Sequence, residues 1–424
     1  MTLYQRWIFF LLSFTYILSF FYRTSTAVIA PDLMNSFKIG ANGLGLLSGV
    51  FFYAFAIIQL PLGPALDWVG PKWTVTGLML LAAIGALIFA VAPSFSYAIL
   101  GRCLIGIGMA SILMGSLKIF TLHFDSSKFA TLTGIIVTLG YLGSICATTP
   151  LAFLVSHIGW RGSFISIAIL NAILSIFIFF SVKDQPLKGV GRKKDDVKVY
   201  DDRTNRKIDP LSSSLILLKS KSFWAMSVLE FVRYGSFASI QGLWGGPFLM
   251  DGYGLSREFT SILLMMISIG YVLGSPWVGF LSEKIFQSRK KVVLWGVILY
   301  SLTILFFLMP FSSTPNIILF LIFLLIGLFN VCSIIVMAHN KELFPIEMSG
   351  TALSTVNFFR FAGVAFYQQM MGYLISFYPR VQDSYPIQAF RTAFLFCFIS
   401  LIIGIISYSF VEDTFHAKGG KVQS

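Results

Sequence analysis

The sequence is a succession of long apolar runs, each about 20 or more residues in length, separated by short polar segments. A run of this length crosses a bilayer as a helix, because only a helix satisfies its own backbone polar groups in lipid. A membrane β-barrel would show alternating segments of ~10 residues instead, and this sequence lacks them. We therefore predict an all-α polytopic membrane protein with twelve transmembrane helices. The runs cover residues 7–30, 44–66, 73–92, 97–119, 130–155, 162–182, 222–248, 259–282, 291–310, 315–338, 350–376 and 390–411.

The composition excludes most soluble classes. Charged residues are 12% of the 424 residues, about half the usual share, and hydrophobic residues are 56%. A soluble domain of this length needs many more charged side chains, so an ordinary soluble enzyme and a disordered chain are both excluded. The four Cys and four His residues lack metal-ligand spacing, and no Gly-x-x-x-x-Gly-Lys phosphate loop or catalytic cluster occurs. We expect no metal, no cofactor, no ATP-driven step and no enzymatic activity.

The positive charge is concentrated in one set of loops. The net charge is +13, and most of the 31 Lys and Arg residues fall in alternate loops on one side of the predicted helices. Because basic loops stay in the cytoplasm, this asymmetry predicts that both termini are cytoplasmic. The basic residues are then topology determinants, so nucleic acid is not an expected partner. We expect a monomer in a lipid bilayer, and the compact loops favour a bacterial inner membrane.

One polar stretch divides the chain. Residues 183–221 form a mixed-charge segment that we interpret as a cytoplasmic linker between six-helix bundles at 1–182 and 222–424. A shift of 216 residues aligns landmarks of the two parts, such as Pro31 with Pro247. Two parallel six-helix repeats are the architecture of a transporter whose site lies between its halves.

The loop after the second run contains Gly63, Asp67, Gly70 and Lys72 in the pattern Gly-x-x-x-Asp-x-x-Gly-x-Lys, and Glu283 takes the place of Asp67 in the second half. The pattern resembles the signature of the major facilitator superfamily. The fourth run and the loop before the sixth carry two further typical elements, Gly101-Arg102-x-x-x-Gly106-x-Gly108 and Gly159-Trp160-Arg161. The resemblance covers the whole chain apart from the linker. It implies a secondary transporter that works by alternating access.

The signature loop also predicts a gate. Gly63 and Gly70 permit a tight turn and close helix approach, and Asp67 can accept hydrogen bonds from the start of a neighbouring helix. The resemblance places that partner near Ser349–Thr351, in a latch that keeps the cytoplasmic side shut. The predicted gating residues are Gly63, Asp67, Gly70, Lys72 and Glu283.

Charges inside the runs are functional candidates, because each costs at least ~2.5–3.5 kcal/mol unless it faces a cavity or a partner. Four of them are Arg23, Arg102, Arg233 and Arg360, against a single deep carboxylate, Glu230. Arginine binds carboxylate or phosphate through two parallel hydrogen bonds, so this balance favours an organic anion as substrate. Two structural alternatives stay open: Arg233 and Glu230 form a self-contained i,i+3 pair, and Arg102 serves helix packing.

The resemblance implies that runs 1, 4, 7 and 10 line a central cavity and that runs 2, 5, 8 and 11 flank it. The predicted substrate-binding residues are Arg23, Tyr53, Gln59, Arg102, Arg233, Gln241, Trp244, Asn357 and Arg360. Apolar parts of the substrate would contact aromatic residues, namely Tyr16, Phe20, Tyr22, Tyr53, Tyr234, Trp244 and Tyr367. The glycine-rich stretch 241–247 is expected to unwind at the external end of its helix.

Proton symport is the expected energy source, because a proton brings positive charge with an entering anion. Symport needs a titratable group, and the candidates are Glu230 and Asp32. The alternative function is an amino-acid or dipeptide carrier, or an exporter, of the same fold. A substrate with an amine would depend on Glu230.

Overall fold

The computed structural model describes residues 1–184, 217–310, 314–344, 349–381 and 384–415. Within these ranges nearly all secondary structure is helical, and an isolated bridge joins Val381 to Ser384. Each of the twelve apolar runs coincides with helix in its described part, which confirms the predicted all-α class. Most of the predicted linker, residues 185–216, lies outside the described residues.

The first group of helices precedes the predicted linker. It comprises α1 (Leu3–Thr24), α2 (Thr26–Phe37), α3 (Ala41–Trp68), α4 (Pro71–Val91), α5 (Phe95–Met109), α6 (Ser111–His123), α7 (Ser126–Cys146) and α8 (Thr149–Ser181). Helix α8 contains Gly159 at φ 71°, a conformation that glycine adopts without strain, and this residue marks the turn between the fifth and sixth runs.

The second group follows the linker. It comprises α11 (Lys221–Ser239), the π-helical turn η1 (Ile240–Trp244), α12 (Gly245–Tyr253), α13 (Arg257–Phe280), the π-helical turn η2 (Leu281–Ile285), α14 (Arg289–Phe306), α15 (Asn316–Asn330), α16 (Ser333–Leu343), α17 (Ser349–Ser376) and α18 (Ile387–Ser409).

Eight stretches of helix in the described ranges are long and apolar enough to cross a membrane by length and composition. An 18-residue window within Asn316–Leu343, for example, has a mean hydropathy of 2.9, and one within Thr149–Ser181 has 2.4. Helices α11 and α17 are not among the eight, and they carry the buried residues Glu230, Arg233 and Arg360. The count of twelve spans and the cytoplasmic position of the termini stay predictions.

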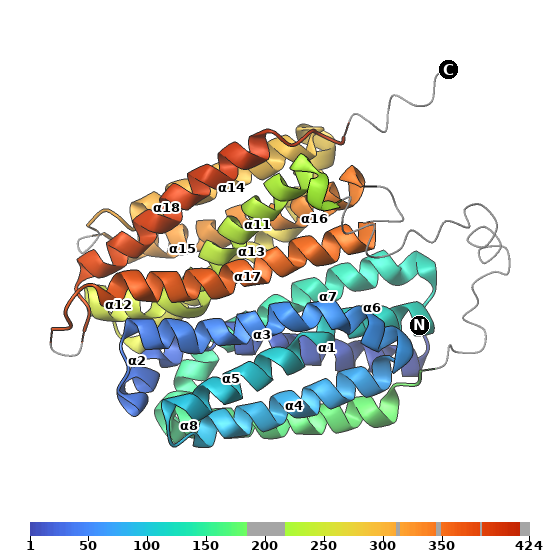
Figure 1. The fold of residues 1–424 in the computed structure, drawn as a ribbon, viewed down its shortest axis with the longest axis horizontal. Helices are drawn as coiled ribbons and strands as arrows, with labels where there is room; N and C mark the ends of the chain where they lie inside the picture. The colour runs from blue at the N-terminus through green and yellow to red at the C-terminus, as the bar shows by residue number, and fades with distance from the viewer. Residues whose placement is uncertain (185–216, 311–313, 345–348, 382–383, 416–424) are drawn as a thin grey trace.

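The two groups meet at one end of the molecule and diverge toward the other (Figure 1). Helix α3 packs along α17. Helices α7 and α8 both contact α13, and α2 contacts η1 and α12. We call the end formed by α2 and α12 the closed end, and the opposite end the open end. At the closed end a Cβ on Gly45 would lie 2.5 Å from the carbonyl oxygen of Gln368, and one on Gly246 would lie 2.1 Å from that of Ala27. Glycine at these two positions therefore permits the close approach of the two groups.

Several helices that border the middle of the bundle are interrupted. A short turn interrupts the helix between α1 and α2 at Ser25, between α5 and α6 at Ala110, and between α15 and α16 after Asn330. The π-helical turn η1 separates α11 from α12. An interruption exposes backbone carbonyls that need donors. The carbonyl of Ala110 accepts a hydrogen bond from Gln59 Nε2 at 3.3 Å, and that of Asn330 accepts one from Arg233 Nη1 at 3.5 Å. Interrupted helices of this kind often flank transport sites.

Candidate functional site

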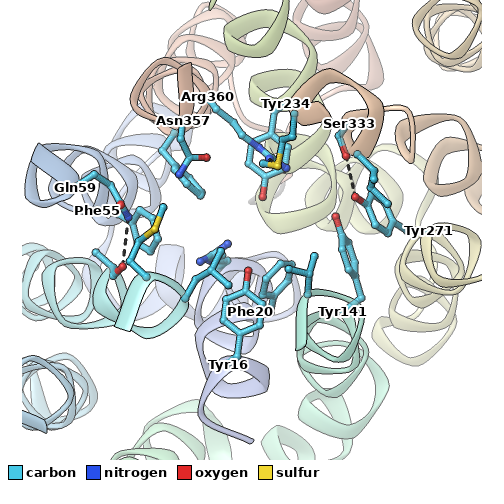
Figure 2. Close-up of a pocket in the computed structure, with 18 residues that line it drawn as sticks. Tyr16, Phe20, Phe55, Gln59, Tyr141, Tyr234, Tyr271, Ser333, Asn357 and Arg360 are labelled. Carbon is cyan, nitrogen blue, oxygen red and sulfur yellow. Dashed lines mark hydrogen bonds between the residues drawn. The ribbon is translucent and has the colours of Figure 1, made fainter. Parts of the chain in front are cut away.

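A cavity lies between the two groups of helices, near the middle of the bundle (Figure 2). Aromatic and apolar side chains dominate its wall, and its charged members are Arg23 and Arg360. None of the described residues that line it is acidic. The lining residues are Tyr16, Phe20, Arg23, Phe55, Gln59, Ala110, Leu113, Met114, Val137, Tyr141, Tyr234, Tyr271, Ser333, Ile334, Met337, Asn357, Arg360 and Phe361.

The cavity communicates with the open end. A second cavity shares Gln59 and Met114 with the first and extends along α3 and α6 to Asp67 and Lys118. Ser354 on α17 completes its wall from the other half. The central cavity is therefore reached from the end at which the halves diverge, while the closed end separates it from the opposite side.

Arg23 enters the cavity from α1. Tyr16, Phe20 and Arg23 are spaced i, i+4 and i+7, so they share one face of the helix. The guanidinium lies 4.6 Å from the ring centre of Phe20, 4.7 Å from that of Phe55 and 5.2 Å from that of Phe361. Its Nη2 donates a hydrogen bond to Ser19 Oγ at 3.3 Å. No carboxylate of the described residues pairs with Arg23, although only 6% of this residue is exposed.

Arg360 reaches the same cavity from α17, in the other half (Figure 2). Its guanidinium stacks 3.9 Å from the ring centre of Tyr234, and its Nη1 lies 4.0 Å from the sulfur of Met337. Its Nε lies 3.6 Å from Glu230 Oε2, which is an ion-pair distance but too long for a hydrogen bond. Arg360 therefore has a partial counter-ion behind it and an open cavity in front.

Glu230 and Arg233 form a closed pair behind the cavity wall. Arg233 donates three hydrogen bonds of 2.6–3.0 Å to the two oxygens of Glu230, and it also bonds Asn330 through the side-chain oxygen. Exposure is 2% for Glu230 and 1% for Arg233, and neither lines the cavity. The i,i+3 pair that the sequence left open is present in the structure.

Polar and aromatic groups complete the cavity wall. Gln59 and Asn357 come from α3 and α17, which face one another across the two halves (Figure 2). On the opposite side the ring of Tyr141 stacks on that of Tyr271, with 3.7 Å between ring centres, and Tyr271 shares a hydrogen bond with Ser333 at 2.8 Å. This stack joins α7 to α13 and closes the cavity laterally.

Besides Arg233, four predicted substrate residues lie outside the central cavity. Arg102 is 1% exposed, bonds the carbonyl of Tyr22 at 3.2 Å and lies 4.9 Å from the ring centre of Phe51, all within the first group of helices. Trp244 donates to the carbonyl of Gln368 on α17 at 3.0 Å. The other two are Tyr53, which bonds Gln369 at 3.2 Å, and Gln241, which bonds Ser268 at 2.8 Å and lines a small cavity beside Arg23.

The stretch 241–247 differs from its expected form. It does not unwind: a π-helical turn at Ile240–Trp244 runs directly into α12. A π turn accommodates an extra residue while it preserves backbone hydrogen bonds, which suits a helix buried on all sides. Gly242 and Gly246 instead allow α2 and the end of α1 to pack against this segment.

An ion pair joins the two halves at the closed end. Arg257 Nη2, at the start of α13, lies 2.8 Å from Asp32 Oδ2 on α2, and both side chains are about one-quarter exposed. The hydroxyl of Tyr385 also accepts a hydrogen bond from the backbone nitrogen of Ala41 at 3.0 Å. We call Asp32 and Arg257 the external latch, because the predicted orientation of the termini would place the closed end outside the cell. The predicted proton-coupling residue Asp32 is thus a bridging residue between the halves.

The predicted gating residues lie at the open end. Asp67 pairs with Lys118 Nζ at 2.6 Å within its own half, and a Cβ on Gly63 would meet open space. Gly70 adopts φ 92°, and the backbone nitrogen of Lys72 donates to Asp184 at 2.9 Å, so Asp184 caps α4. The predicted partner side chains of Asp67, at Ser349–Thr351, lie outside the described part of the chain.

Glu283 occupies the matching position in the second half. It lies 3.4 Å from Arg289 Nη2, which is also 3.4 Å from Glu342. The backbone nitrogen of Arg289 donates to Asp413 at 3.1 Å, so Asp413 caps α14 as Asp184 caps α4. The charge clusters of both halves therefore hold helix ends at the open side.

Sequence reasoning missed part of the cavity wall. Phe55 and Phe361 contact Arg23 from the two halves, but the chain contains 44 Phe residues and nothing in their spacing marks these two. Tyr141 and Tyr271 meet only through the packing of α7 on α13. For Phe55 a usable signal was its position one helical turn before Gln59, on the same face of α3.

Relatives of this chain are transporters by name. The chain is 26% identical over 415 residues to the "Uncharacterized transporter YybO" of Bacillus subtilis, covering 95% of this chain and 92% of the relative. It is 24% identical over 302 residues to the "Probable L-galactonate transporter" of Escherichia coli, covering 68% of this chain and 65% of the relative. It is 23% identical over 291 residues to the "Hexuronate transporter" of Bacillus subtilis, covering 68% and 67%.

The fold also matches a solved structure. A bacterial homologue of the human lysosomal transporter Spinster, in an inward-facing and unoccupied conformation, superimposes with a TM-score of 0.74 at 18% identity, covering 96% of this chain and 97% of that one. The sequence model of the Major Facilitator Superfamily matches residues 12–244 and 226–423. The chain is therefore a multi-pass integral membrane protein and a member of the major facilitator superfamily of transporters, not an enzyme.

Proposed function

We propose that this protein carries a small organic anion across the bacterial inner membrane by alternating access, in symport with protons. The observation that carries the proposal is the placement of Arg23 and Arg360, one from each half, on a single cavity without an acidic lining residue among those described. A guanidinium from each half gives a bound carboxylate or similar anion contacts that connect the two halves.

The cavity also suits a hydroxylated acid. Gln59, Asn357 and Ser333 offer amide and hydroxyl groups beside the arginines, while aromatic rings cover the remaining surface. L-galactonate and hexuronates, after which two relatives are named, each combine one carboxylate with several hydroxyls. This combination favours a sugar acid over an amino acid or dipeptide, because Glu230 is buried in its pair with Arg233 and offers no free contact to an amine.

Alternating access in this proposal means that the two six-helix halves, 1–182 and 222–424, rock about the substrate while residues 183–221 connect them. The present arrangement is closed at the external latch and open along α3 and α6. Opening of the closed end requires that Asp32 and Arg257 separate. Protonation of Asp32 would weaken that pair, which keeps Asp32 beside Glu230 as a candidate for proton coupling.

Uptake by proteoliposomes tests the proposal. Purified protein should accumulate radiolabelled L-galactonate or a labelled hexuronate when the outside is more acidic than the inside, and collapse of the pH gradient with a protonophore should stop accumulation. Arg23→Ala and Arg360→Ala should strongly reduce uptake at low substrate concentration, whereas Arg6→Ala, at an exposed position, should not. Uptake that ignores the pH gradient would refute the symport, and uptake that survives both cavity substitutions would refute the anion site.

A further inference from the structure

The ion pairs around Glu230 are unequal. Arg233 holds both carboxylate oxygens at 2.6–3.0 Å and is itself anchored on Asn330, where the break between α15 and α16 exposes a carbonyl. Arg360 approaches the same carboxylate only to 3.6 Å and makes no hydrogen bond to it through Nε. The first pair is therefore fixed, and the second is loose.

Arg360 is placed between two anion positions. Behind it is Glu230, and in front of it is the central cavity, which Arg360 itself lines. On the cavity side, Nη1 of Arg360 lies 4.0 Å from the sulfur of Met337. The sulfur of a thioether is a weak hydrogen-bond acceptor. A carboxylate in the cavity would therefore be a much stronger acceptor than the group that Nη1 now faces.

Departure of Arg360 would leave Glu230 paired. Because Arg233 alone donates hydrogen bonds to both oxygens of Glu230, Arg360 can move to a substrate and Glu230 still keeps an ionic partner. The reverse holds when the cavity is empty, since a guanidinium that is 8% exposed then needs a counter-ion, and Glu230 supplies it. The fixed pair thus keeps the free-energy cost small when Arg360 moves from Glu230 to the substrate and when it returns.

We propose that Arg360 exchanges ionic partners during transport, binding Glu230 in the empty carrier and the substrate anion in the loaded carrier, with Arg233 as the residue that positions Glu230. The exchange rests on the proposed transport of an organic anion. Its consequence is that Glu230 serves the return of the empty carrier more than the movement of the loaded one. It also makes Glu230 a competitor of the substrate for Arg360.

The test compares two transport modes in one variant. Glu230→Gln combined with Arg233→Met removes the fixed pair as a unit, so that neither of its two members remains as a lone buried charge. Arg360 stays in place but loses its ionic partner in the empty carrier. Exchange of labelled for unlabelled hexuronate across proteoliposomes loaded on both sides uses only the loaded carrier. Net uptake into empty proteoliposomes also requires the empty carrier to return.

We expect exchange within about threefold of the unmodified protein, net uptake reduced about tenfold, and hexuronate bound several-fold more tightly. Glu230→Asp keeps the charge but withdraws it by one methylene from Arg360. It should change exchange and net uptake each in the direction expected for the double variant, but by a smaller factor. It is the second variant if the double substitution fails to fold. Equal loss in both modes, or no loss in either, in the variant that folds would overturn the partner exchange.

The unmodified protein separates this inference from the function on which it rests. If it neither exchanges nor accumulates L-galactonate or a hexuronate, the proposed function fails. If it does both and the variants show no difference between the modes, only the partner exchange fails.

Discussion

The two halves of the molecule stabilise their buried arginines through different contacts. In the first half, Arg23 and Arg102 are held by aromatic rings, a serine hydroxyl and a backbone carbonyl, and no described carboxylate pairs with either. In the second half, Arg233 and Arg360 share Glu230. Arg23 therefore presents to the cavity a charge that no described carboxylate neutralises, while the second half contains its own counter-ion. We infer that the first half supplies attraction for the anion and the second half supplies a reversible contact.

The largest expected effect is on stability, at Arg233. Arg233→Met leaves Glu230 with only the loose contact to Arg360, and loss of one partner of a buried pair costs about 3–5 kcal/mol. The double variant with Glu230→Gln should recover most of this loss, because the uncompensated charge is then gone. Thermal unfolding of the purified protein in detergent measures both. Equal unfolding temperatures for the single variant and the unmodified protein would show that the pair is not structural.

The next effect is on binding, at Arg23. Arg23→Ala removes a charged donor that pairs with no carboxylate among the described residues. The loss of its hydrogen bonds to the anion should therefore weaken binding by about 1.5–3 kcal/mol, or roughly 10- to 150-fold. The fold should persist, because the ring contacts of Arg23 lie at the cavity surface. Competition against labelled hexuronate measures the affinity. An affinity equal to that of the exposed control Arg6→Ala would contradict the assigned role.

A smaller loss is expected at Arg360. The anion must draw Arg360 away from Glu230, so part of its contribution is offset, and Arg360→Ala should weaken binding by about tenfold, or 1.4 kcal/mol. Unfolding temperature should change little, since Glu230 keeps its bonds to Arg233. The same competition assay serves here. A loss greater than that of Arg23→Ala would reverse the proposed difference between the halves.

The smallest effect is expected at the external latch. Asp32 and Arg257 are about one-quarter exposed, and pairs of this kind contribute about 0.2–1 kcal/mol. Asp32→Asn should shift the population toward the outward-open form by at most about fivefold. The shift is measured as faster labelling of a cysteine introduced at Met34, which is 4% exposed in the closed arrangement. Exchange of the two residues, Asp32→Arg with Arg257→Asp, should restore slow labelling. Failure of this exchange to do so would show that the pair does not hold the closed end.

The helical class and two cavity residues could be predicted from the sequence, because both follow from general constraints on membrane proteins. Apolar runs of bilayer length predicted the helical class, and the cost of charge in lipid singled out Arg23 and Arg360, which do line one cavity. Arg102 met the same criterion, yet it faces Phe51 and Phe89 inside its own half. A run of apolar residues does not show which helix face meets a neighbour, so the direction of each arginine could not be derived.

The aromatic wall and the closed end depend on contacts between distant segments. The stack of Tyr141 on Tyr271 and the pair of Asp32 with Arg257 each join the two halves across more than a hundred residues of chain. The resemblance to the major facilitator superfamily indicated which helices meet, but not which side chains do. The repeat was more informative: the breaks at Ala110 and after Asn330 occupy related places in the two halves.

The central claim is that an organic anion binds between Arg23 and Arg360. Calorimetric titration of the purified protein with a hexuronate, at fixed pH and low salt, tests it most directly when Arg23→Ala, Arg360→Ala and Arg6→Ala are measured in parallel. We predict binding to the unmodified protein and to Arg6→Ala with equal affinity, a loss of tenfold or more for Arg360→Ala, and a larger loss for Arg23→Ala. Equal affinity in all four proteins would contradict the claim.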